Sequence, residues 1–150
     1  MKNITNIISI LIIVLFQFSC SDENDEQLST FCDKLIIIDN DIFQNRPDND
    51  GTSRNTFEII NAEIEGDCLS ITIQSGGCDG STWKVDLVDA DRVAETVIPQ
   101  RDLKIFLENT ELCNAIAELT LSFEINSLRT NGNEITLNLE KWDSQLTYSY

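Results

Sequence analysis

Apolar and polar residues alternate along most of this chain, with the two-residue period of a β-strand that buries one face. The pattern is clearest where Leu69, Ile71 and Ile73 alternate with polar residues. Such runs lie at 34–39, 60–64, 69–73, 83–87, 103–107, 119–125, 135–139 and 146–150. Alternation of this kind favours antiparallel sheets. The sequence therefore predicts an all-β fold, an antiparallel β-sandwich (immunoglobulin-like or related) of about 7–8 strands.

The segments between these runs carry turn and cap signals. Glu65-Gly66-Asp67 and Asn131-Gly132-Asn133 each predict a hairpin turn between two strands. Residues 40–55 are rich in Asn, Asp, Pro and Gly, and we expect a long exposed loop there. The spacing of apolar residues in 112–116, after a capping residue at Thr110, predicts one helical turn across an end of the sandwich.

Composition excludes several classes of function. The chain has no histidine, so Ser-His-Asp and Cys-His nucleophile pairs and imidazole bases are absent. Lys and Arg number 10 against 26 Asp and Glu, a net charge of −16. Binding to nucleic acid needs clustered positive charge, so no nucleic-acid partner is expected. No motif for a cofactor is present, and we expect none to be bound.

The first nineteen residues have the organisation of a secretory signal peptide. Lys2 is the only charged residue before Asp22, and 7–18 is almost entirely apolar. Twelve residues of helix span about 18 Å, which is short of the hydrocarbon core of a bilayer. A basic start, a short apolar run and a small residue at its end predict export and removal of 1–19.

The residues at this junction resemble those of bacterial lipoproteins. Ser19-Cys20 ends the apolar run as in a lipobox, and 21–26 is an acidic run similar to the export tag of Bacteroidetes-type surface lipoproteins. The resemblance implies that Cys20 carries a lipid and that the protein lies at the outer membrane or cell surface. Residues 20–31 then form an acidic flexible tether, and 32–150 form the β-sandwich domain.

Four cysteines remain once Cys20 is assigned to the lipid. They are Cys32, Cys68, Cys78 and Cys113, at spacings too wide for a structural zinc site. Export permits disulfides, so two bridges are expected. We favour Cys32–Cys68 with Cys78–Cys113, because each bridge then fastens neighbouring segments. A hairpin-end bridge between Cys68 and Cys78 is the main alternative.

A further resemblance covers 66–142, about half of the chain. It is to uncharacterised small lipoproteins of bacterial envelopes. The residues that carry it are Gly66-Asp67-Cys68-Leu69, Ser75-Gly76-Gly77-Cys78-Asp79-Gly80, Pro99-Gln100-Arg101, Glu111-Leu112-Cys113 and Phe123-Glu124-Ile125. Some of those proteins have a His shortly after the Gly-Gly-Cys segment, where this chain has Gly80-Ser81-Thr82. The resemblance implies a common fold with no established activity.

Two side chains are candidate ligand-binding groups. Arg101 stands between two predicted strands and could bind an anionic ligand, although pairing with a local carboxylate is the commoner role of such an Arg. Trp83 and Trp142 could offer rings on which a sugar stacks. Trp83 shares the strand face of Val85 and Leu87, which predicts burial, so Trp142 is the better surface candidate.

Two pairs of carboxylates are candidates for metal binding and for catalysis. Asp48 and Asp50 precede Gly51 in an acidic loop, but the EF-hand register places Arg46 where a carboxylate ligand is required. Calcium at Asp48 and Asp50 is therefore a weak alternative, and no metal site is expected. Asp67 and Asp79 lie beside cysteines and could form a hydrolytic carboxylate pair, although Asp in a turn is ordinary.

These observations predict a lipid-anchored, non-catalytic β-sandwich module of the cell envelope, with a binding or structural role. The expected partners are the membrane, through Cys20, and an envelope protein or glycan. The alternatives are a glycoside hydrolase that uses carboxylates alone and a calcium-dependent adhesive domain.

Overall fold

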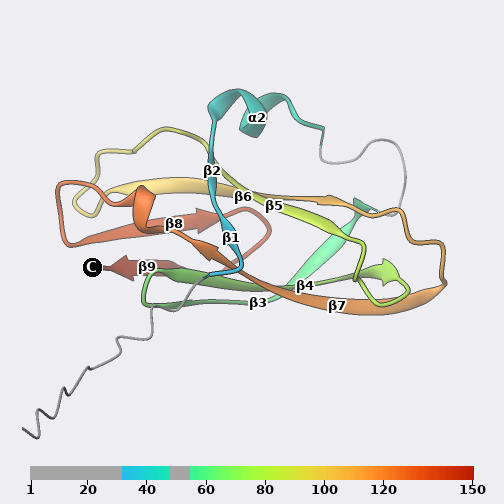
Figure 1. Cartoon of the computed structure of the whole chain (residues 1–150). Helices are drawn as coiled ribbons and strands as arrows, with labels where there is room; N and C mark the ends of the chain where they lie inside the picture. Colours follow the sequence, from blue (N-terminus) through green and yellow to red (C-terminus); the bar gives the residue numbers. More distant parts are fainter. Residues whose placement is uncertain (1–31, 48–54) are drawn as a thin grey trace, which may run out of the picture.

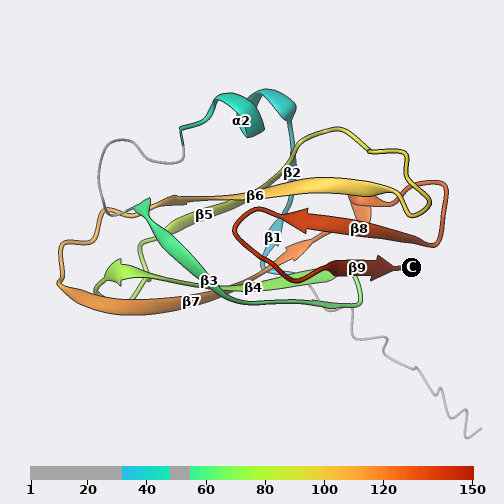
Figure 2. The same cartoon turned by 180° about the vertical axis from the view of Figure 1, so that it is seen from behind.

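The alternating apolar residues are buried between two β-sheets, as the sequence predicted. This computed structural model describes residues 32–47 and 55–150. Cys20, the predicted signal peptide and tether, and Asp48 and Asp50 lie outside the described residues. Figure 1 shows the two sheets as stacked layers, and Figure 2 shows the same layers from behind. The predicted β-sandwich is confirmed.

The two sheets divide nine strands between them. Sheet A has the order β1-β7-β4-β3, and sheet B has the order β2-β5-β6-β8-β9. The strands of sheet A are β1 (Lys34–Leu35), β3 (Phe57–Glu65), β4 (Cys68–Gly77) and β7 (Ala115–Glu124). Those of sheet B are β2 (Ile37–Ile38), β5 (Lys84–Asp89), β6 (Gln100–Glu108), β8 (Glu134–Leu139) and β9 (Leu146–Ser149).

The sheets are mixed rather than wholly antiparallel. Pairs β1–β7, β2–β5 and β6–β8 are parallel, while the other four pairs are antiparallel. Alternation shows that one face of a strand is buried, but it does not encode the direction of the neighbouring strand. Strands β6 and β8 are parallel because the chain changes sheet between them, to form β7 in sheet A, and then returns to sheet B.

Segment 34–39 is such a change of sheet. The sequence predicts one short strand there, whereas the structure has two, one in each sheet, joined by the buried Ile36. Figure 1 shows this segment rising in blue from the lower layer to the upper layer. It is followed by helix α2 (Asn40–Asn45), where we expected loop. Asp39 caps α2 by accepting a hydrogen bond from the Ile42 backbone N–H at 2.9 Å.

Helix α2 covers the outer face of sheet B. Phe106, on that face of β6, is only 2% exposed. The guanidinium carbon of Arg46, which follows α2, lies 4.8 Å from the centre of the Phe106 ring. Arg46 also pairs with Asp86 of β5 at 2.8 Å. These contacts explain how an aromatic residue on an outer face is buried.

Two turn predictions have different outcomes. Gly66 and Asp67 form the turn between β3 and β4, and Gly66 has a φ of 57°, which glycine adopts without strain. This hairpin is confirmed. The hairpin predicted at Asn131-Gly132-Asn133 is wrong, because β7 and β8 belong to different sheets. A short 3₁₀ turn, Asn126–Leu128, begins the connection between them.

The helical turn predicted over 112–116 is also wrong. Residues 109–114 are irregular, and β7 begins at Ala115. Leu112 and Ile116 are 77% and 74% exposed, so the apolar spacing there does not reflect a buried helix face.

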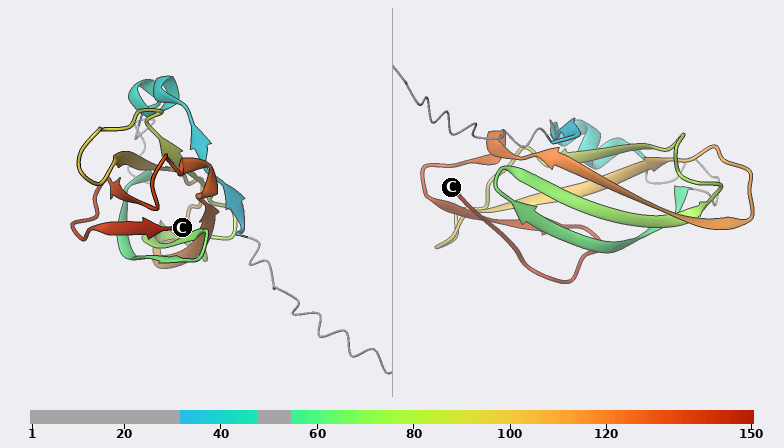
Figure 3. Two further views of the ribbon diagram at one scale, coloured as in Figure 1. Left: turned by 90° about the vertical axis from the view of Figure 1, so that its left-hand side faces the viewer. Right: turned by 60° about the horizontal axis from the view of Figure 1, so that its bottom comes forward.

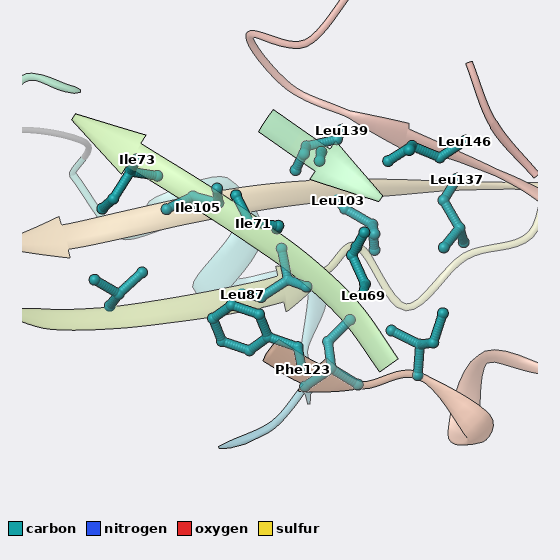
Figure 4. Close-up of a cluster of buried hydrophobic side chains, with 14 of the residues drawn as sticks. Leu69, Ile71, Ile73, Leu87, Leu103, Ile105, Phe123, Leu137, Leu139 and Leu146 are labelled. Atoms are coloured by element: carbon teal, nitrogen blue, oxygen red, sulfur yellow. The ribbon is translucent and has the colours of Figure 1, made fainter. Parts of the chain in front are cut away.

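The core lies between the sheets and is made mainly by alternate residues of β4, β5, β6, β7, β8 and β9. Figure 4 shows side chains from both sheets meeting in one layer: Leu69, Ile71, Ile73, Leu87, Leu103, Ile105, Phe123, Leu137, Leu139 and Leu146. Leu69, Leu87, Leu103 and Phe123 are 0% exposed. This continuous apolar layer supplies most of the stabilisation by removing side chains from water.

Candidate functional site

Two disulfides fix the two ends of β4, which lies between β3 and β7. Cys68 begins β4 and is bonded to Cys32, while Cys78 directly follows β4 and is bonded to Cys113. This is the pairing favoured from the sequence. The bridges lie at opposite ends of the sandwich, which we call the Cys32 end and the Cys113 end.

At the Cys113 end, the loop after β4 encloses a carboxylate. The Glu111 side chain accepts hydrogen bonds from the backbone N–H groups of Cys78 and, at 3.3 Å, of Gly80. It also accepts one from the Thr82 hydroxyl at 3.0 Å. Burial opposes ionisation, but these hydrogen bonds outweigh it and lower the pKa of Glu111. No local sequence pattern predicts this role of Glu111, because the donors lie about 30 residues away along the chain.

Trp83 and Gly77 pack beside Glu111 at this end of the sandwich. Trp83 is 7% exposed, as its strand parity predicted, so it offers no stacking surface for a sugar. A Cβ atom at Gly77 would lie 2.5 Å from Oε2 of Glu111 and 3.0 Å from the Trp83 ring. Position 77 therefore requires glycine. The Trp83 Nε1 is buried and has no hydrogen-bond partner among the described residues.

At the Cys32 end, three polar side chains join the β3–β4 turn to the end of the chain. The Tyr148 hydroxyl donates to Oδ1 of Asp67 at 2.5 Å, and Nη2 of Arg129 lies 2.5 Å from the same oxygen. Nε of Arg129 also donates to the Tyr148 hydroxyl at 2.9 Å. The hydrogen bond from Tyr148 is the main cause of a lowered pKa at Asp67. Burial, reinforced by Asp67, raises the pKa of Tyr148 to about 12.

Asp67 and Asp79 therefore cannot act as a pair. They flank β4 at its two ends, and a strand of ten residues spans about 33 Å. The two carboxyl groups of a glycoside hydrolase lie within about 10 Å of each other. Asp79 instead accepts a hydrogen bond from the Ser81 backbone N–H at 3.0 Å, an ordinary turn contact.

Arg101 pairs with a carboxylate of its own chain. Its Nε and Nη2 lie 3.0 and 2.8 Å from the two carboxylate oxygens of Asp89. The two side chains are 9% and 0% exposed. The hydrogen bonds to Asp89 raise the pKa of Arg101. Arg101 thus has the local carboxylate partner that is the commoner role of such an Arg, and the pair holds the base of the loop between β5 and β6.

Trp142 lines a pocket at the hairpin between β8 and β9. The pocket has a volume of about 260 Å³, and Asn138, Asp143, Ser144 and Gln145 contribute to its wall. The Trp142 ring packs against the core, and its buried Nε1 has no partner among the described residues. An aromatic ring beside amide, hydroxyl and carboxylate groups suits a ligand rich in hydroxyl groups. This pocket is the candidate binding site.

The outer face of sheet A is a second polar surface, which sequence reasoning did not single out. Thr72 and Thr120 are directly opposite on β4 and β7, with their hydroxyl oxygens 2.8 Å apart. In the next row Gln74 donates to Glu118 at 2.7 Å. Beyond it, a groove of about 310 Å³ lies over Gly76. The alternation of polar residues on each strand was readable, but the rows depend on register between distant segments.

Neither a metal cluster nor a membrane-spanning helix is found in the part of the chain that the structure describes. Within 32–47 and 55–150, no three His, Cys, Asp or Glu residues are grouped so as to hold a metal ion. No helix in those ranges is both long and apolar enough to cross a membrane. The proposed lipidation site Cys20 and the weak calcium candidates Asp48 and Asp50 are outside these ranges.

Comparison with known proteins gives one distant structural match. No protein-family model matches the chain, and no curated protein matches it. A crystal structure of a Bacteroides vulgatus protein of unknown function (DUF1344) matches with a TM-score of 0.46 and 15% identity. The match covers 78% of this chain and 55% of that protein, so this chain spans about half of its length. At this level of similarity the match carries no inference about function.

Proposed function

We propose that this protein is a lipid-anchored, non-catalytic binding module of the bacterial cell envelope. The observation that carries the proposal is the pair of disulfides at the two ends of β4. Structural disulfides persist outside the cytoplasm and are rare in reducing compartments. They agree with a signal peptide over 1–19, with lipidation at Cys20, and with residence at the outer membrane or cell surface.

Four carboxyl groups of the described chain act as hydrogen-bond acceptors within the fold. Asp33, Asp67, Asp79 and Glu111 all have lowered pKa values because hydrogen-bond donors surround them. A general acid needs the opposite, a carboxyl group whose pKa is raised by an apolar environment. These four carboxylates serve the fold by satisfying turns and loops.

The Trp142 pocket is where we place the ligand, and a glycan is the class that fits it. Sugar rings stack on indole, and their hydroxyl groups bond to amide and carboxylate groups such as those of Asn138 and Asp143.

Titration of the protein with soluble envelope polysaccharides should change tryptophan emission. The response should disappear in W142F and persist in W83F, since Trp83 is buried at the Cys113 end. A response that survives W142F would exclude this pocket.

The anchor is tested separately from the ligand. Cells supplied with an alkyne-labelled fatty acid should attach the label to the wild-type chain and to C32S, but not to C20A. Cys32 is the matched control because the fold uses it in a disulfide. Equal labelling of C20A and wild type would refute lipidation at Cys20, whatever the pocket binds.

A further inference from the structure

The loop between β5 and β6 presents apolar side chains to solvent. Val97 is fully exposed, and Val93 and Ile98 are 38% and 37% exposed. We call these three residues the loop tip. With Pro99 and Thr130, among others, two of them line a hollow of about 350 Å³ between this loop and the connection from β7 to β8. Apolar side chains gathered in one loop of an otherwise acidic protein indicate an interaction surface.

The loop tip lies at the Cys32 end of the sandwich. Cys32 contacts the Asp67 carbonyl oxygen, and Asp67 pairs with Arg129. Thr130, the next residue, lines the same hollow as Val97. Figure 1 and the right-hand view of Figure 3 place the C-terminus and the β5–β6 loop at the same end, and the described chain starts in the same half of the molecule, farther in from that end.

The loop is held in a fixed shape. Ala94 and Gln100 exchange two backbone hydrogen bonds, of 2.9 and 3.1 Å, and the Thr96 hydroxyl donates to the Ile98 carbonyl oxygen. The buried Asp89–Arg101 pair fastens the strands from which the loop emerges. A surface that is already ordered loses little conformational entropy when it binds.

We propose that the loop tip inserts into the surface of the membrane that carries the lipid anchor. This inference rests on the proposed lipidation of Cys20. Cys32 follows Cys20 by 12 residues. Such a segment reaches at most about 40 Å when fully extended, so the anchor keeps the Cys32 end close to the bilayer. The high local concentration allows a few apolar side chains to hold the domain in one orientation.

The distribution of charge favours the same orientation. The exposed acidic residues Glu58, Glu63 and Glu118 lie on β3 and β7 of sheet A, where an anionic membrane surface repels them. Near the loop tip, Arg92 pairs with Asp102 at 3.1 Å, and Glu95 is the exposed acidic residue between Val93 and Val97. The loop tip therefore presents fewer exposed acidic residues to an anionic bilayer than these strands of sheet A do.

Quenching of tryptophan by lipids with brominated acyl chains tests the contact. The full lipidated protein is reconstituted as wild type, V97W and L112W in vesicles of phosphatidylethanolamine and phosphatidylglycerol. Leu112 is the matched control, since it is 77% exposed at the Cys113 end. Val97 is fully exposed, so V97W should not disturb folding. Subtracting the wild-type signal isolates the emission of the added indole.

We expect brominated lipid to remove most of the added emission of V97W and to leave that of L112W unchanged. Equal quenching of the two variants in membrane-bound protein would overturn the loop contact and leave the proposed lipid anchor intact. Protection of position 97 by a protein in cells, with no quenching in vesicles, would also overturn it. A chain that carries no lipid at Cys20 would overturn both proposals.

Discussion

In the part of the chain that the structure describes, each buried charged side chain has a partner of opposite charge or a set of hydrogen-bond donors. Asp89 and Arg101 illustrate the first arrangement, with side chains that are 0% and 9% exposed. Glu111 illustrates the second, because the backbone N–H groups of Cys78, Asp79 and Gly80 donate hydrogen bonds to its side chain. In each case the folded chain replaces the water that a charged group loses on burial.

Replacing Arg101 by methionine should be strongly destabilising. R101M keeps most of the side-chain volume but leaves Asp89 buried without its cation, which costs about 3–5 kcal/mol. The R92M variant is the control, because the Arg92 side chain is 60% exposed, and loss of a surface pair costs at most about 1 kcal/mol. Urea unfolding measures both effects. Adding D89N to R101M should recover part of the loss, and equal effects of R101M and R92M would contradict the prediction.

Replacing Glu111 by glutamine should alter the dependence of stability on pH. The pKa of Glu111 is lowered from 4.5 in the folded protein, so its contribution to stability is present above pH 4.5 and is lost as the pH falls through the folded pKa. E111Q should therefore melt below the wild type at pH 7, and the gap should narrow below pH 4.5. Thermal melts from pH 7 to pH 3 measure the gap, with the exposed E108Q as control. A gap that is constant with pH would refute this role.

The sequence predicts the long strands of this protein better than it predicts how those strands pair. The alternation predicted the long strands because each buries one face in the same core. It did not reveal which strands pair, since Asn131-Gly132 resembles a hairpin turn although β7 and β8 lie in different sheets. Trp142, which the sequence singles out, lines the candidate pocket, whereas no local pattern predicts the hydrogen bonds that backbone N–H groups donate to Glu111. Strand pairing and the surroundings of Glu111 both depend on contacts between distant segments, which a local sequence pattern does not encode.

The segment 32–38 is the element that depends most on a covalent bond. Strands β1 and β2 pair through two residues each, and the Cys32–Cys68 bridge fastens the segment to β4. In the C32S/C68S variant this segment should open without unfolding of the sandwich. Amide hydrogen exchange should speed up at Leu35 and Ile38 and stay slow at Ile71 in the core. Uniformly faster exchange at all three positions would show that the bridge stabilises the whole domain instead.

The two bridges should differ in their effect on the whole molecule although they enclose loops of similar length. Cys78 and Cys113 are 35 residues apart and enclose β5 and β6, two long strands of sheet B whose inward side chains belong to the core. Cys32 and Cys68 are 36 residues apart, but the segment on one side can detach alone. Loop length alone therefore does not rank the two bridges.

Removal of the Cys78–Cys113 bridge should lower the melting temperature of the whole domain. A closed loop of this length contributes about 3–4 kcal/mol by restricting the unfolded state, which corresponds to a loss of about 12–16 °C in a domain of this size. Calorimetry of C78S/C113S, with C32S/C68S as the matched control, measures the difference under non-reducing conditions. We expect the larger drop from C78S/C113S, because no part of sheet B can detach from the core without exposing Leu87 and Leu103, both of which are fully buried. A smaller drop than in C32S/C68S would mean that the nest of hydrogen bonds around Glu111 holds the Cys113 end together without the bridge.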